Sequence, residues 1–200
     1  MKVGDVELAY EDRGHGDSSS PGQGYGFDQL AADLHGLFDA AGIAQADLLG
    51  HSLGGMVALR FVLAHPERVA SLILMDSGAR GVPSLGTTFA RAVASAQRDG
   101  MSRISAAVGM APLSSEERQI ADLEGEARYR ERIRCPTTVL VGELDVPFLP
   151  LADELAAGIA GAHLVRIAGA GHSPQKSGRA AWLAAVRAHV TRVRTIPARS

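Results

Sequence analysis

The sequence lacks the features that mark secreted and membrane proteins. Its only cysteine, Cys135, has no partner for an internal disulfide, as is typical of a chain in a reducing compartment. No apolar run approaches the roughly 20 residues of a membrane-spanning helix. Residues 1–7 (MKVGDVE) lack the apolar core of a signal peptide. We therefore expect a cytoplasmic protein with no membrane partner.

Strong charge and metal-binding motifs are also missing. Twenty Lys and Arg against 22 Asp and Glu give a formal net charge of −2, which offers no attraction for nucleic acid or an anionic membrane surface. The sequence has no H-E-x-x-H motif, no paired cysteines and no cluster of carboxylates, so no metal is expected. Gly14-His15-Gly16 is followed by neither P-loop nor dinucleotide spacing. We expect no cofactor.

What the chain does contain is an alternation of strand and helix patterns. Near-continuous apolar runs at 69–75, 137–141 and 163–167 are typical of parallel strands covered on both faces. Apolar residues at helical spacing predict helices over 27–41, 53–64, 151–159 and 182–193. With 46% apolar and 21% charged residues, the composition suits a soluble globular domain. The fold class is therefore α/β, a mostly parallel sheet with helices on both faces.

One long stretch interrupts this alternation. Residues 80–134 contain no convincing strand but several apolar patches at helical spacing, and Ser114 with Glu117 fits a capping box. We interpret residues 80–134 as a small helical lid inserted into a core made of residues 1–79 and 135–200. The alternative is an ordinary crossover connection of unusual length.

A short apolar run and a helical pattern flank the motif Gly50-His51-Ser52-Leu53-Gly54. A G-x-S-x-G motif between a strand and a helix is the context of a nucleophile elbow. Because the turn is tight, we expect Gly50 and Gly54 to have no room for a side chain. The elbow would expose the Ser52 hydroxyl at a helix N-terminus, where free N–H groups and the helix dipole favour negative charge.

Serine needs a base to take its proton, and the base needs an acid to orient it. Asp145 follows the strand pattern at 137–141, and His172 follows the one at 163–167. In a parallel sheet these strand ends meet at one edge. Asp76, at another strand exit, is a reserve acid, and Asp145 could instead be only a turn residue. Five other histidines are expected to be residues without a catalytic role, His51 as a structural residue of the elbow and the rest as ordinary surface or packing residues: His35, His65, His163 and His189.

Several segments resemble the α/β-hydrolase superfamily, in particular small esterases, enol-lactonases and cofactor-free haloperoxidases. They are the elbow at 50–56 (GHSLGGM), HPERV at 65–69, VGELD at 141–145 and GAGHSP at 169–174. The resemblance implies that Ser52 is the nucleophile, His172 the general base and Asp145 the orienting acid. It also makes the Leu53 backbone N–H one donor of an oxyanion hole.

The sequence departs from this family near its start. Residues 9–14 look like the end of the family's second strand, and residues 13–18 look like the end of its fourth, so the third and fourth strands are apparently missing. The second oxyanion donor normally follows the third strand. We expect a truncated α/β-hydrolase fold in which a hairpin within residues 2–10 lies beside the strand ending at Gly50. If that strand has an open edge instead, two copies could associate through it.

Three functions remain open from the sequence. The favoured one is a serine hydrolase for a small carboxylic ester or lactone, impaired by the loss of one oxyanion donor. The second is a catalytically silent remnant that acts as a binding or interaction module. The third is an acyltransferase or perhydrolase that uses the same three residues on a different acceptor.

Overall fold

The computed structural model describes residues 2–3, 6–7, 27–79 and 132–195 of the 200-residue chain. Most of the lid predicted at 80–134 lies outside these residues. Within the described ranges, none of the helices combines the length and apolar character needed to cross a bilayer.

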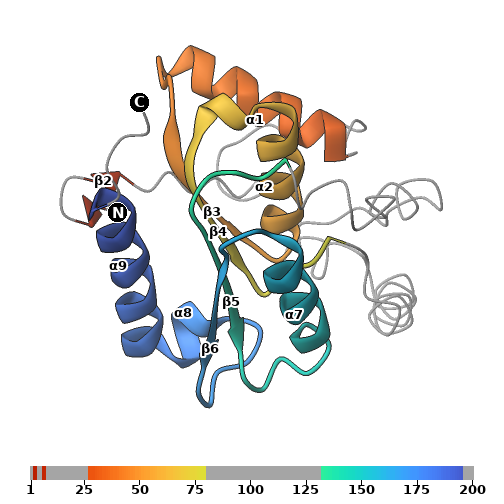
Figure 1. The fold of residues 1–200 in the computed structure, drawn as a ribbon, viewed down its shortest axis with the longest axis vertical. Coiled ribbons are helices and arrows are strands. Elements are labelled where there is room, and N and C mark those ends of the chain that lie inside the picture. The colour runs from red at the N-terminus through yellow and green to blue at the C-terminus, as the bar shows by residue number, and fades with distance from the viewer. Residues whose placement is uncertain (1, 4–5, 8–26, 80–131, 196–200) are drawn as a thin grey trace, which may run out of the picture.

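The centre of the fold is a parallel sheet of four strands in the order β3-β4-β5-β6 (Figure 1). β4 and β6 begin and end where the apolar runs predict, whereas β3 and β5 extend beyond theirs. The predicted α/β class with a parallel sheet is confirmed. The strand bounds are β3 Ala46–His51, β4 Val69–Met75, β5 Thr137–Gly142 and β6 His163–Ile167.

The N-terminal hairpin is not where the sequence analysis expects it. β1 (Lys2–Val3) and β2 (Val6–Glu7) pair antiparallel as a separate sheet of two strands. Among the described strands, β3 is bonded to β4 alone. Strands of two residues carry almost no alternating apolar pattern, and it is this pattern that specifies strand pairing. The sequence therefore predicts that the hairpin forms, but not that it is separate from the main sheet.

The helices follow the predicted apolar spacing, and their ends have local causes. α1 (Phe27–Ala40) ends before Gly42, whose φ of 65° is the left-handed conformation that glycine adopts readily. α2 (Leu53–Ala64) stops before Pro66, which opens the short 3₁₀ helix η1 (Pro66–Arg68). The remaining helices are α7 Leu149–Gly158, α8 Pro174–Ser177 and α9 Arg179–Thr195.

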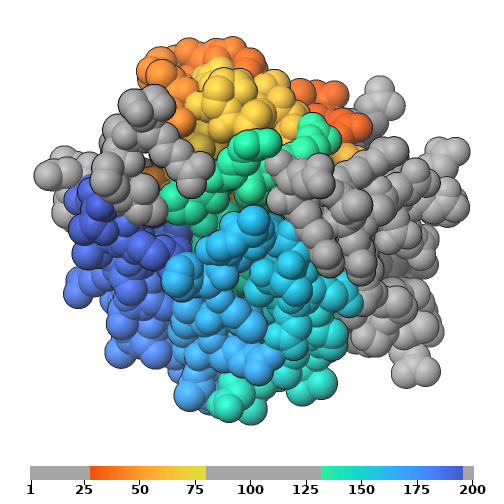
Figure 2. Space-filling model, in the orientation of Figure 1, coloured from red at the N-terminus to blue at the C-terminus, as the bar shows by residue number. Residues whose placement is uncertain are grey.

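Side chains of the central strands alternate between two apolar layers, as expected for a period of two. On β4, Leu72 and Leu74 belong to the layer formed with α1, α2 and α7, whereas Ile73 and Met75 face the layer that contains Trp182 of α9. In Figure 1, α9 lies on one side of the sheet and α2 and α7 lie on the other. Helices therefore cover both faces, as predicted. On the surface shown in Figure 2, the green part of the chain lies between the yellow and the blue parts.

A buried polar network lies at the amino ends of the strands. His189 of α9 is 1% exposed; its Nε2 lies 2.9 Å from Ser71 Oγ, and its Nδ1 lies 2.8 Å from Thr138 Oγ1. Ser71 donates to Asp47 Oδ1 at 2.6 Å, and Arg192 donates to Thr138 Oγ1 at 2.9 Å. Of the two roles expected for His189, surface or packing, the structure shows the second: it is a buried, hydrogen-bonded residue that ties α9 to the sheet.

Because all four strands are parallel, their carboxyl ends lie at one edge of the sheet. Ser52, Asp76, Asp145 and His172 each follow a different strand at this edge. Open α/β sheets hold their ligands at such an edge.

Candidate active site

Ser52 occupies a strained turn between β3 and α2. Its φ of 53° and ψ of −120° are unusual for a residue other than glycine. The turn is anchored to the neighbouring strand, since the Ser52 N–H donates to Met75 O at 2.9 Å. The hydroxyl of Ser77 donates to Ser52 O at 2.8 Å. This is the backbone geometry of a nucleophile elbow.

The glycines of the elbow differ in how closely they are packed. A Cβ on Gly50 would overlap the backbone of Gly54 and Gly55. A Cβ on Gly55 would overlap the side chain of Ser77. A Cβ on Gly54, by contrast, would meet nothing within 4 Å among the described residues, so the expectation that it has no room is wrong. The tight approach needs glycine one residue later, at Gly55, because that is where α2 passes the end of β4.

The three residues singled out by the sequence converge at this edge. His172 Nε2 lies 3.0 Å from Ser52 Oγ, and His172 Nδ1 lies 2.8 Å from Asp145 Oδ2. Both are hydrogen-bond distances. The Asp145 side chain is 7% exposed, whereas that of His172 is 41% exposed. The imidazole thus has a buried carboxylate on one nitrogen and a hydroxyl on the other.

Backbone contacts between two loops hold Asp145 beside His172. Leu144 donates its N–H to Ala170 O at 2.8 Å, and the Gly169 N–H donates to Glu143 Oε2 at 3.0 Å. A Cβ on Gly142 would overlap the backbone oxygens of this same loop. The close approach of the loops after β5 and β6 therefore depends on glycine at 142.

Two side chains that the sequence analysis did not assign to the site flank the His172 ring. Phe148, buried at the start of α7, has its ring centroid 4.7 Å from that of His172. The ring of His51 lies 5.1 Å away, and its Nε2 is 2.6 Å from His172 O. Burial lowers the pKa of His51, so its neutral ring donates this N–H. A large apolar residue shortly after the acid was the available signal for Phe148.

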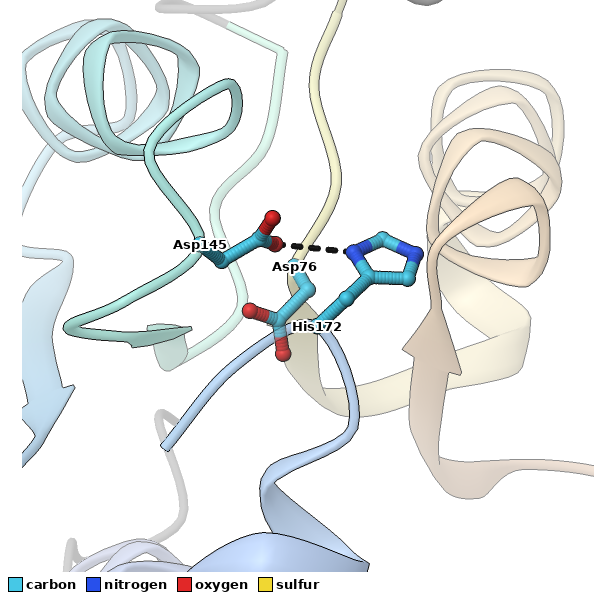
Figure 3. A group of neighbouring side chains, drawn as sticks. All are labelled: Asp76, Asp145 and His172. Atoms are coloured by element: carbon cyan, nitrogen blue, oxygen red, sulfur yellow. Dashed lines mark hydrogen bonds and ion pairs between the residues drawn. The ribbon is translucent and has the colours of Figure 1, made fainter. Parts of the chain in front are cut away.

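Asp76, the reserve acid, lies in the same group without bonding His172 (Figure 3). It is 0% exposed, and its Oδ1 accepts the Gly142 N–H at 2.9 Å. The pKa of its carboxyl is raised to about 7 because the group is buried and because the negative Asp145 lies beside it. Figure 3 shows the bond of His172 going to Asp145.

The structure brings the two candidate acids, Asp76 and Asp145, into one group with His172. One donor atom each from Asp76, Asp145 and His172 lies within 4.8 Å of the others, the spacing of a metal site. His172 Nδ1 is, however, already bonded to Asp145, and Asp76 Oδ1 to the Gly142 N–H. The donor set therefore fits a hydrogen-bonded acid and base better than a cation.

Leu53, the expected oxyanion donor, is the first residue of α2. Its N–H therefore belongs to the donors that have no acceptor within the helix. It follows Ser52 directly, at the positive end of the helix dipole. Residues 14–26, the loop in which a replacement for the second donor would have to be sought, lie outside the described residues.

Comparisons with known proteins agree with the fold. A sequence model of the family described as "alpha/beta hydrolase fold" matches residues 8–83. A thermophilic esterase from Thermogutta terrifontis superposes with a TM-score of 0.72 at 26% identity, over 92% of this chain and 78% of its own. The enol-lactonase from Burkholderia xenovorans LB400 gives a TM-score of 0.67 at 27% identity, over 90% and 78%. The chain has the α/β-hydrolase fold.

Sequence relatives of this α/β-hydrolase are matched over shorter segments. The 3-oxoadipate enol-lactonase 2 of Acinetobacter baylyi is 37% identical over 73 residues, which is 36% of this chain and 27% of the relative. The matched segments span 45% or less of the first curated relatives. The comparisons thus support the α/β-hydrolase fold, and the activity of the chain is a matter for proposal.

Proposed function

We propose that this α/β-hydrolase is a serine hydrolase that cleaves a small carboxylic ester or lactone through an acyl-enzyme. The observation that carries the proposal is the pair of contacts made by His172, 3.0 Å to Ser52 Oγ and 2.8 Å to Asp145 Oδ2. A base placed between a hydroxyl and a buried carboxylate is the arrangement that activates serine. The esterase and enol-lactonase names of the relatives support this substrate class.

The reaction follows from these contacts. His172 Nε2 takes the Ser52 proton as Oγ attacks the carbonyl carbon, and Asp145 stabilises the imidazolium that forms. The imidazolium then protonates the leaving alkoxide, and the acyl group stays on Ser52. Water repeats the sequence: it loses a proton to His172, attacks the acyl carbon and releases the acid with Ser52 reprotonated.

The Leu53 N–H and the dipole of α2 stabilise the tetrahedral oxyanion. A site with one oxyanion donor in place of two loses about 10² to 10³ in turnover, or roughly 3 to 4 kcal/mol. We therefore expect slow hydrolysis of p-nitrophenyl acetate, whose leaving group needs little help, and little turnover of unactivated alkyl esters.

A fluorophosphonate probe and p-nitrophenyl acetate test the proposal together. Ser52 should be labelled and the ester hydrolysed by the wild type, and Ser52→Ala should lose both. Ser173→Ala, which removes another hydroxyl from the loop after β6, is the matched control and should keep both.

The alternatives give different results. No Ser52-dependent labelling or hydrolysis in folded protein would refute the hydrolase and favour a silent binding module. Labelling combined with faster acyl transfer to an alcohol or to peroxide than to water would favour an acyltransferase or a perhydrolase.

A further inference from the structure

Asp76 is a fully buried carboxyl group that the proposed reaction leaves without a role. It is 0% exposed and sits directly after β4, with a φ of 44° that aspartate tolerates better than most residues. Its Oδ1 is satisfied by the Gly142 N–H at 2.9 Å. Its Oδ2 is buried and has no hydrogen-bond donor among the described residues. A buried oxygen without a partner costs about 1 to 3 kcal/mol, more for a charged group.

The neighbours of Asp76 explain how that oxygen can be satisfied. One carboxylate oxygen of Asp76, one of Asp145 and a ring nitrogen of His172 all lie within 4.8 Å of one another. Two ionised carboxylates have no proton to share, and they repel each other strongly in a buried site. If one carboxyl keeps its proton, the pair gains a hydrogen bond and loses the repulsion.

The surroundings of Asp145 favour its charged form more than the surroundings of Asp76 do. Asp145 accepts a bond from His172 Nδ1 at 2.8 Å, and this bond stabilises its negative charge. Asp76 is the more deeply buried and accepts a single backbone N–H. The proton therefore belongs on Asp76.

We infer that Asp76 holds a proton below neutral pH and donates it in a hydrogen bond to Asp145, which makes Asp76 a positioning residue for the acid of the site. The role rests on the proposed function, since it matters to catalysis only if His172 is the base. Asp145 then carries one negative charge, held by Asp76 on one side and directed at His172 Nδ1 on the other. His51 and Phe148 contact His172 and do not compete for this proton.

Infrared spectroscopy detects the proton without any catalytic assay. At about pH 6, where exposed carboxyl groups are ionised, the wild type should show the carbonyl stretch of a protonated carboxylic acid. The band should be absent from Asp76→Asn and present in Asp153→Asn, the control at an exposed aspartate paired with Arg166. Absence of the band from the wild type, or its persistence in Asp76→Asn, would overturn the inference.

Kinetics test the positioning role. Asp76→Ala removes the donor, so kcat for p-nitrophenyl acetate should fall about tenfold with KM nearly unchanged. Asn can donate to Asp145 and accept from Gly142 as the protonated acid does, so Asp76→Asn should recover most of that loss. The wild-type kcat should also decline as pH rises through about 7, where Asp76 ionises, and Asp76→Asn should lack this decline.

An Asp76→Asn variant as slow as Asp76→Ala, or one that retains the same decline with pH, would refute the positioning role. The infrared and kinetic experiments together distinguish a failure of this inference from a failure of the proposed function. If the wild type hydrolyses no ester, the serine hydrolase fails and the positioning role fails with it. The infrared band still decides whether Asp76 carries the proton.

Discussion

Replacement of His189 by glutamine tests how two buried groups, His189 and Asp76, set the stability of the fold in acid. His189 is 1% exposed, and its pKa is lowered to about 4, because burial disfavours the charged ring and Arg192 lies beside it. Asp47 and His163 also act on it, in opposite directions. The His189 ring binds a proton near pH 6.5 in the unfolded chain, but only near pH 4 in the folded chain. Stability contributed by neutral His189 is therefore lost as pH falls through this window.

The magnitude follows from the two pKa values. The difference between 6.5 and about 4 corresponds to roughly 3 kcal/mol, at about 1.4 kcal/mol for each pKa unit. Asp76 acts with the opposite sign, because its folded pKa of about 7 lies above its ordinary 3.8. Its contribution, roughly 4 kcal/mol, is present in acid and is lost as pH rises from about 4 to 7. The two effects nearly cancel over the same window.

Urea unfolding at several pH values between about 4 and 8 measures this balance. Wild type should be nearly flat across the window, His189→Gln should be more stable in acid than at neutral pH, and Asp76→Asn should be less stable in acid. Glutamine can still donate and accept, so it retains contacts to Ser71 and Thr138. His51, whose pKa burial also lowers, is present in all three proteins and drops out of the comparison. Parallel pH dependences in all three proteins would refute the reasoning.

The elbow and its surroundings give two further predictions. Gly50→Ala should destabilise the fold by about 1 to 3 kcal/mol and abolish fluorophosphonate labelling, because its Cβ would overlap the backbone of α2. Gly54→Ala, with open space around its Cβ, should unfold no earlier than the wild type in urea, and an equal loss in both variants would argue against the steric account. His51→Phe should lower kcat about tenfold with little change in KM, since it removes the 2.6 Å contact to His172 O; unchanged kcat would show that the contact does not position the ring.

The sequence predicts the elements that carry strong periodic patterns. The apolar runs at β4 and β6 match the observed strands residue for residue, and the start of α2 follows the elbow directly. These elements are specified locally by their own apolar patterns, although only β4 is buried along most of its length, whereas in β6 only Ile167 is buried. The short hairpin β1–β2 has no such pattern, and its separation from β3 could not be predicted.

In the site, too, residues placed by a strand pattern could be predicted and contacts made between loops could not. Ser52, Asp145 and His172 each end a recognisable strand, so their meeting at one edge follows from parallel topology. The contacts of Asp76, His51 and Phe148 depend on how loops close over that edge. Such contacts join residues far apart in the sequence, and no local spacing encodes them. The tightness of Gly55, set by Ser77, is of the same kind.

The side chains of the candidate site and the second oxyanion donor depend on different parts of the sheet. Ser52, Asp145 and His172 follow β3, β5 and β6, and Asp76 follows β4, so all four depend on strands that the parallel sheet contains. The apparently missing third and fourth strands of the family would lie beyond β3 and would supply the second oxyanion donor. If the chain lacks that side of the sheet, we expect the proposed proton transfer to be kept and the stabilisation of the oxyanion to be weaker. Activated esters, which depend least on that stabilisation, are therefore the substrates on which this chain should act.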